Sequence, residues 1–237
     1  MKRFALCIIM CAVFGCDLPS NLKYMESPSH SIIGISLSIN LYNALPKKQS
    51  SVYFVKLDDK DENNLGKKII RCNFYKGIMA EGYYAFLVNA EPGTYAAVCS
   101  TKYDRLTFGD NRAEASKYEE FGYITFFDSE MIKKTVTEVG PGQIAFMGSY
   151  TIDSQLKSPY MNIEKNGDRA QKHYYSQLKS IMEGTYYCGS MVKGDRSGKL
   201  TREFLVKAKN YLKNSEWLKI IDGAIAEFDE SAKGKMI

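Results

Sequence analysis

The residues best suited to chemistry in this chain are its six cysteines and its two histidines. Thiolates and imidazole rings serve as nucleophiles, bases and metal ligands. The cysteines lie at positions 7, 11, 16, 72, 99 and 188, and none of them belongs to the C-x-x-C pair typical of metal and redox sites. We therefore expect no metal site, no redox pair and no bound cofactor.

Nucleophilic catalysis would have to depend on His173, because His30 lies in a segment rich in proline and serine. A Ser/His/Asp or Cys/His system needs a base beside its nucleophile. The stretches FMGSY and YCGSM lack the second glycine of the G-x-S-x-G elbow, and the sequence contains no H-E-x-x-H, P-loop or G-x-G-x-x-G motif. The sequence thus predicts no catalytic residues and a protein that is not an enzyme.

The acidic stretch DDKDENN, residues 58–64, alternates its acidic and amide side chains as a calcium-binding loop does. An EF-hand loop also needs a glycine at its sixth position and a bidentate glutamate at its twelfth. Asn64 and Ile70 occupy those positions, so the stretch does not fit such a loop. We interpret it as a solvated hairpin loop.

Two further kinds of site depend on how the chain folds. Paired carboxylates for glycoside hydrolysis are defined by their separation in space, so a cell-wall-directed hydrolase with carboxylates in a cleft stays open as the alternative function. The 17 tyrosines, with pairs at 83/84, 174/175 and 186/187, could form a surface for protein or carbohydrate. In a β-rich chain we favour the interpretation that they pack in the core and across strands.

The first residues have the layout of a signal peptide. Lys2 and Arg3 precede an uninterrupted apolar run, residues 4–14, which has the length of a signal h-region. A membrane-spanning helix needs roughly 20 residues. The run closes with VFGC, residues 13–16, and the sequence turns polar at once.

The stretch VFGC resembles the bacterial lipobox, in which an aliphatic residue, a small residue and Gly or Ala precede an invariant cysteine. The resemblance implies that residues 1–15 are a lipoprotein signal peptide and that Cys16 carries a diacylglyceryl group on sulfur and an acyl chain, such as palmitate, on its amine. Phe14 departs from the pattern, as loose lipoboxes of spirochaetes do. The alternative is a cleaved ordinary signal or a short uncleaved anchor whose cysteines are merely apolar.

Such a lipid would attach the protein to a membrane of the cell envelope, because two or three acyl chains hold far better than one. We expect the outer membrane rather than the inner one, although Asp17 resembles an inner-membrane retention signal of enterobacteria. Loss of Lys2 and Arg3 with the signal lowers the formal charge from +5 to +3, which is too mild to indicate nucleic acid. The expected partners are an envelope protein, a host protein or a glycan.

Export would permit disulfides among the cysteines that remain after cleavage. Cys72 with Cys99 is the favoured pair, because both lie in predicted strands. The alternative, that they are small buried apolar residues, stays open.

Residues 16–31 are rich in proline and serine and are expected to be a lipidated tether. Residues 32–155 are expected to be a β domain, because Ile33, Ile35 and Leu37 alternate with small or polar residues at the period of a strand. The other strand candidates are SVYFVKL, KKIIRCNFY, YYAFLVNA, GTYAAVCS, YITFFD, TVTEV and QIAFMGSYTI. Short strands without intervening helix patterns predict an antiparallel β-sandwich.

Within this region, SVYFVKL, YYAFLVNAEPGTYAAVCS and TEVGPGQIAFMGSYTI resemble small lipid-anchored bacterial domains of the DUF2846 and prealbumin-like type. The resemblance rests on turn motifs such as PGTY, and it implies a β-sandwich and no catalytic residues. The residues expected in its core are Ile33, Ile35, Leu37, Phe86, Val88 and Ile144.

Residues 156–237 are expected to be a helical C-terminal region. Asp168 and Gln171 match a capping box before one helix, and Thr201 is the expected N-cap of a second helix. In a third helix an apolar stripe runs from Trp217 to Phe228, and we expect it to pack within the same chain. The predicted protein is thus α+β, a lipid-anchored envelope protein that acts as a binding or structural module.

Overall fold

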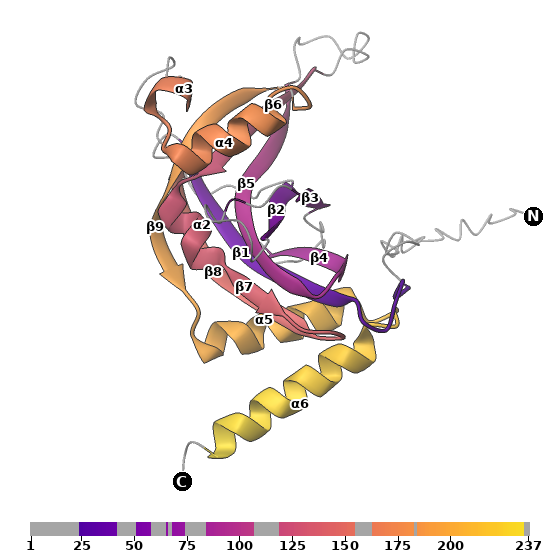
Figure 1. Ribbon diagram of the computed structural model, residues 1–237. Helices are drawn as coiled ribbons and strands as arrows, with labels where there is room; N and C mark the ends of the chain where they lie inside the picture. The colour runs from indigo at the N-terminus through magenta and orange to yellow at the C-terminus, as the bar shows by residue number, and fades with distance from the viewer. Residues whose placement is uncertain are drawn as a thin grey trace, which may run out of the picture.

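The computed structural model describes residues 24–41, 51–57, 65, 68–73, 84–106, 119–154, 163–182 and 184–234. In these ranges the chain forms a strongly curved β-sheet with helices at two opposite ends (Figure 1). The strands are β1 (Ser31–Leu41), β2 (Ser51–Leu57), β3 (Lys68–Asn73), β4 (Tyr84–Ala90), β5 (Gly93–Leu106), β6 (Glu119–Phe127), β7 (Thr137–Val139), β8 (Ile144–Ser154) and β9 (Thr185–Asp195). The helices are α2 (Ser129–Thr135), α3 (Ile163–Asn166), α4 (Arg169–Leu178), α5 (Gly198–Tyr211) and α6 (Leu218–Gly234).

The described strands belong to a single sheet in the order β3-β2-β5-β6-β9-β8-β1-β4, and β7 pairs with the start of β5. The pairs β1–β8 and β6–β9 are parallel, whereas the other pairs are antiparallel. The two edge strands β3 and β4 approach each other, so the sheet curls almost into a barrel. A sheet curled in this way buries its inner face against itself.

The predicted antiparallel β-sandwich is therefore wrong. The strand β9, which belongs to the range predicted to be helical, lies between β6 and β8 near the middle of the sheet. Its sequence TYYCGSMVKGD mixes glycines with polar residues and lacks the apolar alternation of a half-buried strand. The parallel pairs join segments that are remote in sequence, and hairpin signals carry no information about such pairs.

The core contains the apolar residues that the strand alternation predicted. Three of the six expected core residues are fully buried: Ile33, Ile35 and Leu37. The other three are partly buried beneath the C-terminal helices: Phe86, Val88 and Ile144. The strand β1 is thus covered on both faces, whereas the sequence predicted one buried face.

The helix α4 packs on β6, at the end of the sheet opposite α5 and α6 (Figure 1). Its predicted capping box is confirmed, because Asp168 accepts from the Gln171 N–H while the Gln171 side chain accepts from the Asp168 N–H. The Gln171 amide also donates to the carbonyls of Phe126 and Gly189. One buried side chain therefore ties the helix to two neighbouring strands.

The C-terminal helices differ from the prediction at one end. Helix α5 follows Ser197 and begins at Gly198, so Thr201 lies in its first turn and is not its N-cap. The side chain of Trp217 is fully buried, as expected of the apolar stripe. No helix in the described ranges is both long and apolar enough to cross a bilayer.

Candidate functional site

Helices α5 and α6 form an antiparallel hairpin at one end of the sheet (Figure 1). Two ion pairs join them: Arg202 lies 2.8 Å from Asp229, and Lys209 lies 2.8 Å from Asp222. These side chains are about half exposed, and exposed pairs contribute little to stability. Their spacing along both helices nevertheless favours one register of the hairpin over others.

The hairpin rests on an aromatic floor that faces away from the main core. In the strand register, Gly34 of β1 is the direct neighbour of Phe86 on β4 and of Phe146 on β8. The ring of Phe204, from α5, lies in this row. Its centroid is 4.6 Å from that of Phe146 and 5.5 Å from that of Phe86, and Tyr84 extends the cluster at 6.0 Å. The four rings come from two strands and one helix, and their mutual stacking favours a fixed geometry.

The missing side chain of Gly34 makes room for the Phe204 ring. A Cβ atom at this position would lie closer than 3.0 Å to two ring carbons, Cε2 and Cζ, and 3.1 Å from a third, Cδ2. Side chains in folded proteins do not approach so closely, because packed interiors leave no such overlap. Because Gly34 has no side chain, the Phe204 ring packs closer to strand β1 than any other residue at position 34 would allow.

A groove of about 400 Å³ lies between the two helices above this floor. It is lined by Ile144, Phe146, Thr201, Phe204, Leu205, Ala224, Glu227, Phe228 and Ser231. Six of the nine lining residues are apolar, and Glu227 and Ser231 are exposed at its rim. Its volume lies within the range of ligand sites, and the groove is open to solvent.

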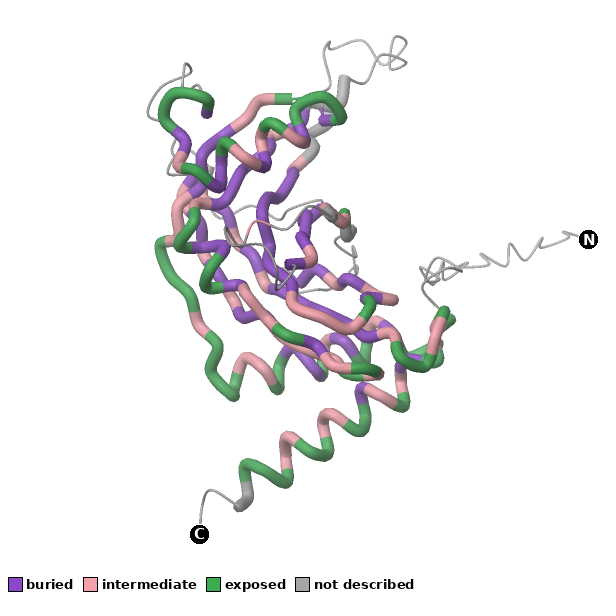
Figure 2. The backbone as a smooth tube through the Cα atoms, viewed as in Figure 1, coloured by how far each residue is buried: buried purple, intermediate pink, exposed green. Residues whose placement is uncertain are grey.

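The apolar stripe of α6 is only partly covered by the rest of the chain. Trp217 and Ile221 are fully buried, whereas none of residues 222–232 is (Figure 2). Ala224 and Phe228 stay half-buried as the wall of the groove. The first part of the stripe thus docks within the chain, as predicted, and its outer part leaves an apolar surface open.

Tyr84, which belongs to the aromatic floor, keeps its phenol proton. Burial, and then the charge and hydrogen bond of the Glu203 carboxylate, raise the pKa of Tyr84 well above its ordinary value of 10.0. The phenol therefore serves as a hydrogen-bond donor at physiological pH. Among the described residues, Glu227 is the only acidic one that lines the groove, so they place no carboxylate pair there.

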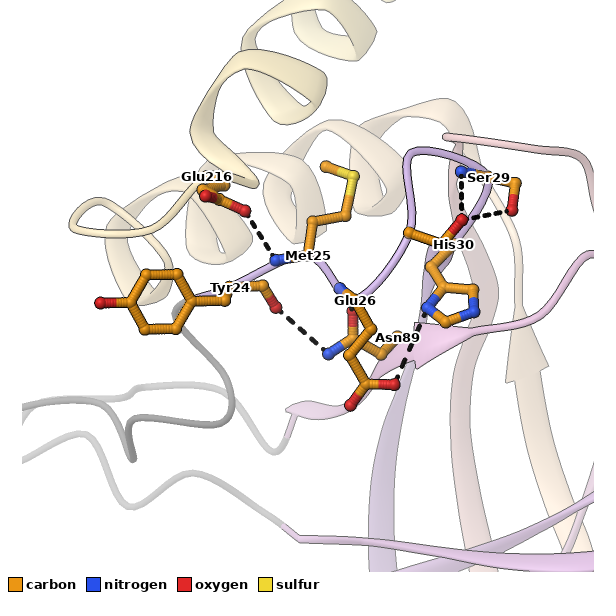
Figure 3. Close-up of polar contacts among 8 residues, drawn as sticks. Tyr24, Met25, Glu26, Ser29, His30, Asn89 and Glu216 are labelled. Carbon is orange, nitrogen blue, oxygen red and sulfur yellow. Dashed lines mark hydrogen bonds and ion pairs between the residues drawn. The ribbon is translucent and has the colours of Figure 1, made fainter.

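Residues 24–30 form a strap that joins the end of β4 to the helical hairpin (Figure 3). The backbone N–H of Met25 donates to Oε2 of Glu216 at 2.8 Å, just before α6 begins. The side chain of Asn89 accepts from the Glu26 N–H at 3.1 Å and donates to a strap carbonyl at 3.2 Å. Asn89 has φ 60°, a conformation that asparagine tolerates. The strap thus fixes where the N-terminal part of the chain meets the fold.

Two carboxylates approach each other elsewhere, at the starts of α2 and α4. Asp168 accepts from the N–H groups of Ser129 at 2.6 Å and Gln171 at 2.9 Å, and Asp128 accepts from the Met131 N–H at 2.8 Å. Burial is the main cause that raises the pKa of Asp128, and the nearby Asp168 charge adds to it. Because both carboxylates bind backbone donors, the pair accounts for the helix ends and does not indicate a hydrolase.

Only some of the predicted site residues belong to the described ranges. Cys16 and residues 58–64 lie outside the described ranges. Cys99 is a buried free thiol of β5, Cys72 belongs to β3, and β2 stands between these strands. Strands separated by a third lie about 9.5 Å apart, whereas a disulfide needs Cα atoms within about 7 Å. A Cys72–Cys99 bridge would not fit this strand spacing, and the burial of Cys99 fits the alternative of a small apolar residue at that position.

The histidines and tyrosines do not assemble a site in the described ranges. His30 belongs to the strap and His173 to α4, and neither lines the groove. No group of three His, Cys, Asp or Glu residues suited to a metal occurs among the described residues. Tyr84, Tyr174 and Tyr187 are buried, which supports the interpretation that the paired tyrosines contribute to packing.

The sequence of β4 contains a signal for the groove. In β4, Tyr84 and Phe86 share one face while Ala85 and Leu87 share the other, so both faces are apolar. A strand that is apolar on both faces must be covered on both. The cover here is α5, whose Phe204 fell within a predicted helix without an assigned partner.

Comparisons with known proteins add little to this picture. No protein-family model and no curated protein matches the chain. A crystal structure of a Pseudomonas aeruginosa protein, proposed to bind carbohydrate, is similar to it with a TM-score of 0.25 and 11% sequence identity, over 55% of this chain and 96% of that one. A similarity this weak does not extend to fold or function.

Proposed function

We propose that the protein is a non-enzymatic binding module of the bacterial envelope, held at a membrane by a lipid on Cys16, and that it takes an apolar ligand in the groove between α5 and α6. The observation that carries the proposal is the open groove of about 400 Å³ over a floor of stacked aromatic rings. Contiguous open apolar surface on a folded chain is often functional.

The groove is shaped by packing within the chain itself. The Phe204 ring packs over Gly34, and the ion pairs Arg202–Asp229 and Lys209–Asp222 favour one register of the two helices. A site that is already shaped loses less conformational freedom when it binds. Burial of apolar ligand surface then contributes about 25 cal/mol for each Å² removed from water.

The lining selects the chemistry of the ligand. Phenylalanine, isoleucine and leucine side chains match an acyl chain or the apolar side chains of a partner protein. The rim hydroxyls of Thr201 and Ser231 suit a neutral polar end, and Glu227 disfavours an anionic one. A glycan presents hydroxyls that this lining would leave without hydrogen bonds. A glycan is therefore a less favoured ligand of this groove than an apolar molecule.

The proposal that the protein is not an enzyme is supported by the same lining. In the part of the chain that the structure describes, Glu227 is the only ionisable side chain of the lining, whereas glycoside hydrolysis uses two carboxylates about 5–10 Å apart. The described pair Asp128 and Asp168 caps helices instead.

Membrane attachment is tested by replacing Cys16 with serine. The wild type is expected to enter the detergent phase of a phase separation, and Cys16→Ser is expected to stay in the aqueous phase with a different mature mass. A Cys16→Ser variant that still enters the detergent phase at the wild-type mass would place the anchor elsewhere. Proteolysis of intact cells then distinguishes surface exposure from an internal location.

Ligand binding is tested with a single-chain lipid that carries a neutral fluorescent headgroup, used on the Cys16→Ser chain so that no lipid of its own competes. Ala224→Phe fills the groove, and Ala226→Phe adds the same ring to an exposed position of the same helix. We expect saturable binding that falls at least tenfold in Ala224→Phe and less than twofold in Ala226→Phe. Equal affinities in the two variants, or no saturable binding, would contradict the proposal.

A further inference from the structure

We infer that one acyl chain of the protein's own lipid occupies the α5–α6 groove while the protein is in water, and leaves it when the anchor enters a membrane. The inference deepens the proposed function and rests on it, because it requires both the lipid on Cys16 and an apolar site. The structure supports it through the place where the N-terminal segment meets the fold, the reach of that segment and the lining of the groove.

The N-terminal segment meets the fold at the same helix that walls the groove. Met25 is bound through its backbone to Glu216, and its side chain packs on the cluster that contains Trp217 and Ile221. Asn89 holds the next residue of the strap. Figure 3 shows the strap passing directly beside Glu216, so the tether starts at the first turn of α6.

The tether is long enough to bring the lipid to the groove. Cys16 precedes Tyr24 by eight positions, and an extended chain of that length spans at most about 26–29 Å. Along α6, Phe228 lies ten positions after Leu218, a distance of about 15 Å at the rise of an α-helix. The sulfur of Cys16 can therefore stand above the middle of the groove without stretching the chain.

A tethered acyl chain has a large advantage over any free amphiphile. A short flexible linker gives its end an effective concentration on the order of millimolar at a site within reach. In water, each methylene of an exposed acyl chain favours transfer into the nearest apolar environment. The groove lies along α6, and the strap contacts Glu216 just before that helix begins.

The lining of the groove matches one chain of the lipid in polarity. Its apolar lining ends at the hydroxyls of Thr201 and Ser231 and the carboxylate of Glu227. The ester or amide group that joins an inserted acyl chain to the rest of the lipid would lie beside these polar groups, near water. Because the bilayer accepts all the acyl chains of the lipid together, insertion empties the groove and makes it available to a ligand.

Photo-crosslinking of the lipidated full-length protein tests this inference. Cells are supplied with a fatty acid that carries a photoactivatable group, and the lipidated protein is isolated, freed of detergent and irradiated as a monomer. We expect crosslinks from the lipid to peptides that contain residues 144–146, 201–205 and 224–231. Added phosphatidylcholine vesicles should reduce these crosslinks at least fivefold, and Ala224→Phe should do so without vesicles while Ala226→Phe should not.

The outcomes separate the inference from the function on which it rests. A labelled protein whose crosslinks fall outside the groove, or are unchanged by Ala224→Phe, overturns the inference and leaves the lipid anchor standing. A protein that takes up no label overturns both. Irradiation of a mixture of isotopically light and heavy protein identifies crosslinks between two molecules, and such crosslinks would overturn the claim that the chain occupies its own groove.

Discussion

Replacing Gly34 with alanine tests whether one missing side chain sets the aromatic floor. The new Cβ would lie closer than 3.0 Å to two carbons of the Phe204 ring, which is fully buried and stacked at 4.6 Å on Phe146. In an ordinary strand, alanine is more stable than glycine by about 0.5–1 kcal/mol. Overpacking costs about 1–3 kcal/mol, so after this gain is subtracted we expect a net loss of about 1 kcal/mol.

A double-mutant cycle tests whether the overlap with the Phe204 ring causes the loss of stability in Gly34→Ala. In a Phe204→Ala background the overlap is gone, and Gly34→Ala should then be neutral or slightly stabilising. Gly223→Ala is the matched control, because its Cβ would meet nothing within 4 Å and alanine is favoured in a helix by about 1 kcal/mol. The free energies of unfolding are measured in urea, with Trp217 fluorescence as the signal.

Two results would refute the reasoning. One is a Gly34→Ala protein as stable as the wild type, which would mean that Phe204 has room to move. The other is a Gly34→Ala substitution that lowers the free energy of unfolding by the same amount whether residue 204 is phenylalanine or alanine. If the ring is instead pushed outward, Gly34→Ala should also weaken ligand binding, because Phe204 lines the groove.

Three further predictions concern other parts of the chain. Ile35→Asp should destabilise the fold by several kcal/mol, because an unpaired charge would enter the core; a variant with the wild-type melting temperature would contradict this. The emission of Trp217 should be blue-shifted and poorly quenched by acrylamide, since its side chain is fully buried, and red-shifted emission from a folded monomer would show that α6 stands away from the sheet. Burial, with the Glu91 charge adding to it, raises the pKa of Tyr95 from 10.0 to about 12, so its contribution to stability is complete below pH 10 and is lost as the pH rises towards 12. Tyr95→Phe should therefore lose less stability than the wild type between pH 10 and pH 12 in urea titrations, and equal losses would contradict the assignment.

The features that the sequence predicted are those that depend on neighbours along the chain. The strand β2 coincides with the predicted SVYFVKL, and the capping box of Asp168 and Gln171 lies where the pattern placed it. Ile33 and Ile35 are buried because alternation within one strand decides which side faces the core. None of these features requires knowledge of which strands pair.

The features that the sequence did not predict depend on contacts between remote segments. The strand β9 has little apolar alternation because glycines such as Gly189 bring it close to its neighbours, where a Cβ would meet Thr125 and Ile152. Gly34 was interpreted as part of an open polar face, whereas a helix some 170 positions later covers it. The groove follows from this cover, since only the packing of α5 and α6 decides which apolar surface stays open.

The position of β9 has a consequence for the order in which the molecule can form. It is the last described strand along the chain, yet it lies between β6 and β8. Strand β6 can pair with β5, and β8 with β1, but each lacks its second partner until residues 185–195 are available. Contacts of such large sequence separation make folding slow, and unpaired strand edges promote association between chains. During synthesis the sheet therefore remains two incomplete parts with open edges until about four fifths of the 237 residues have been made. A chain that stops before β9 would keep those edges permanently.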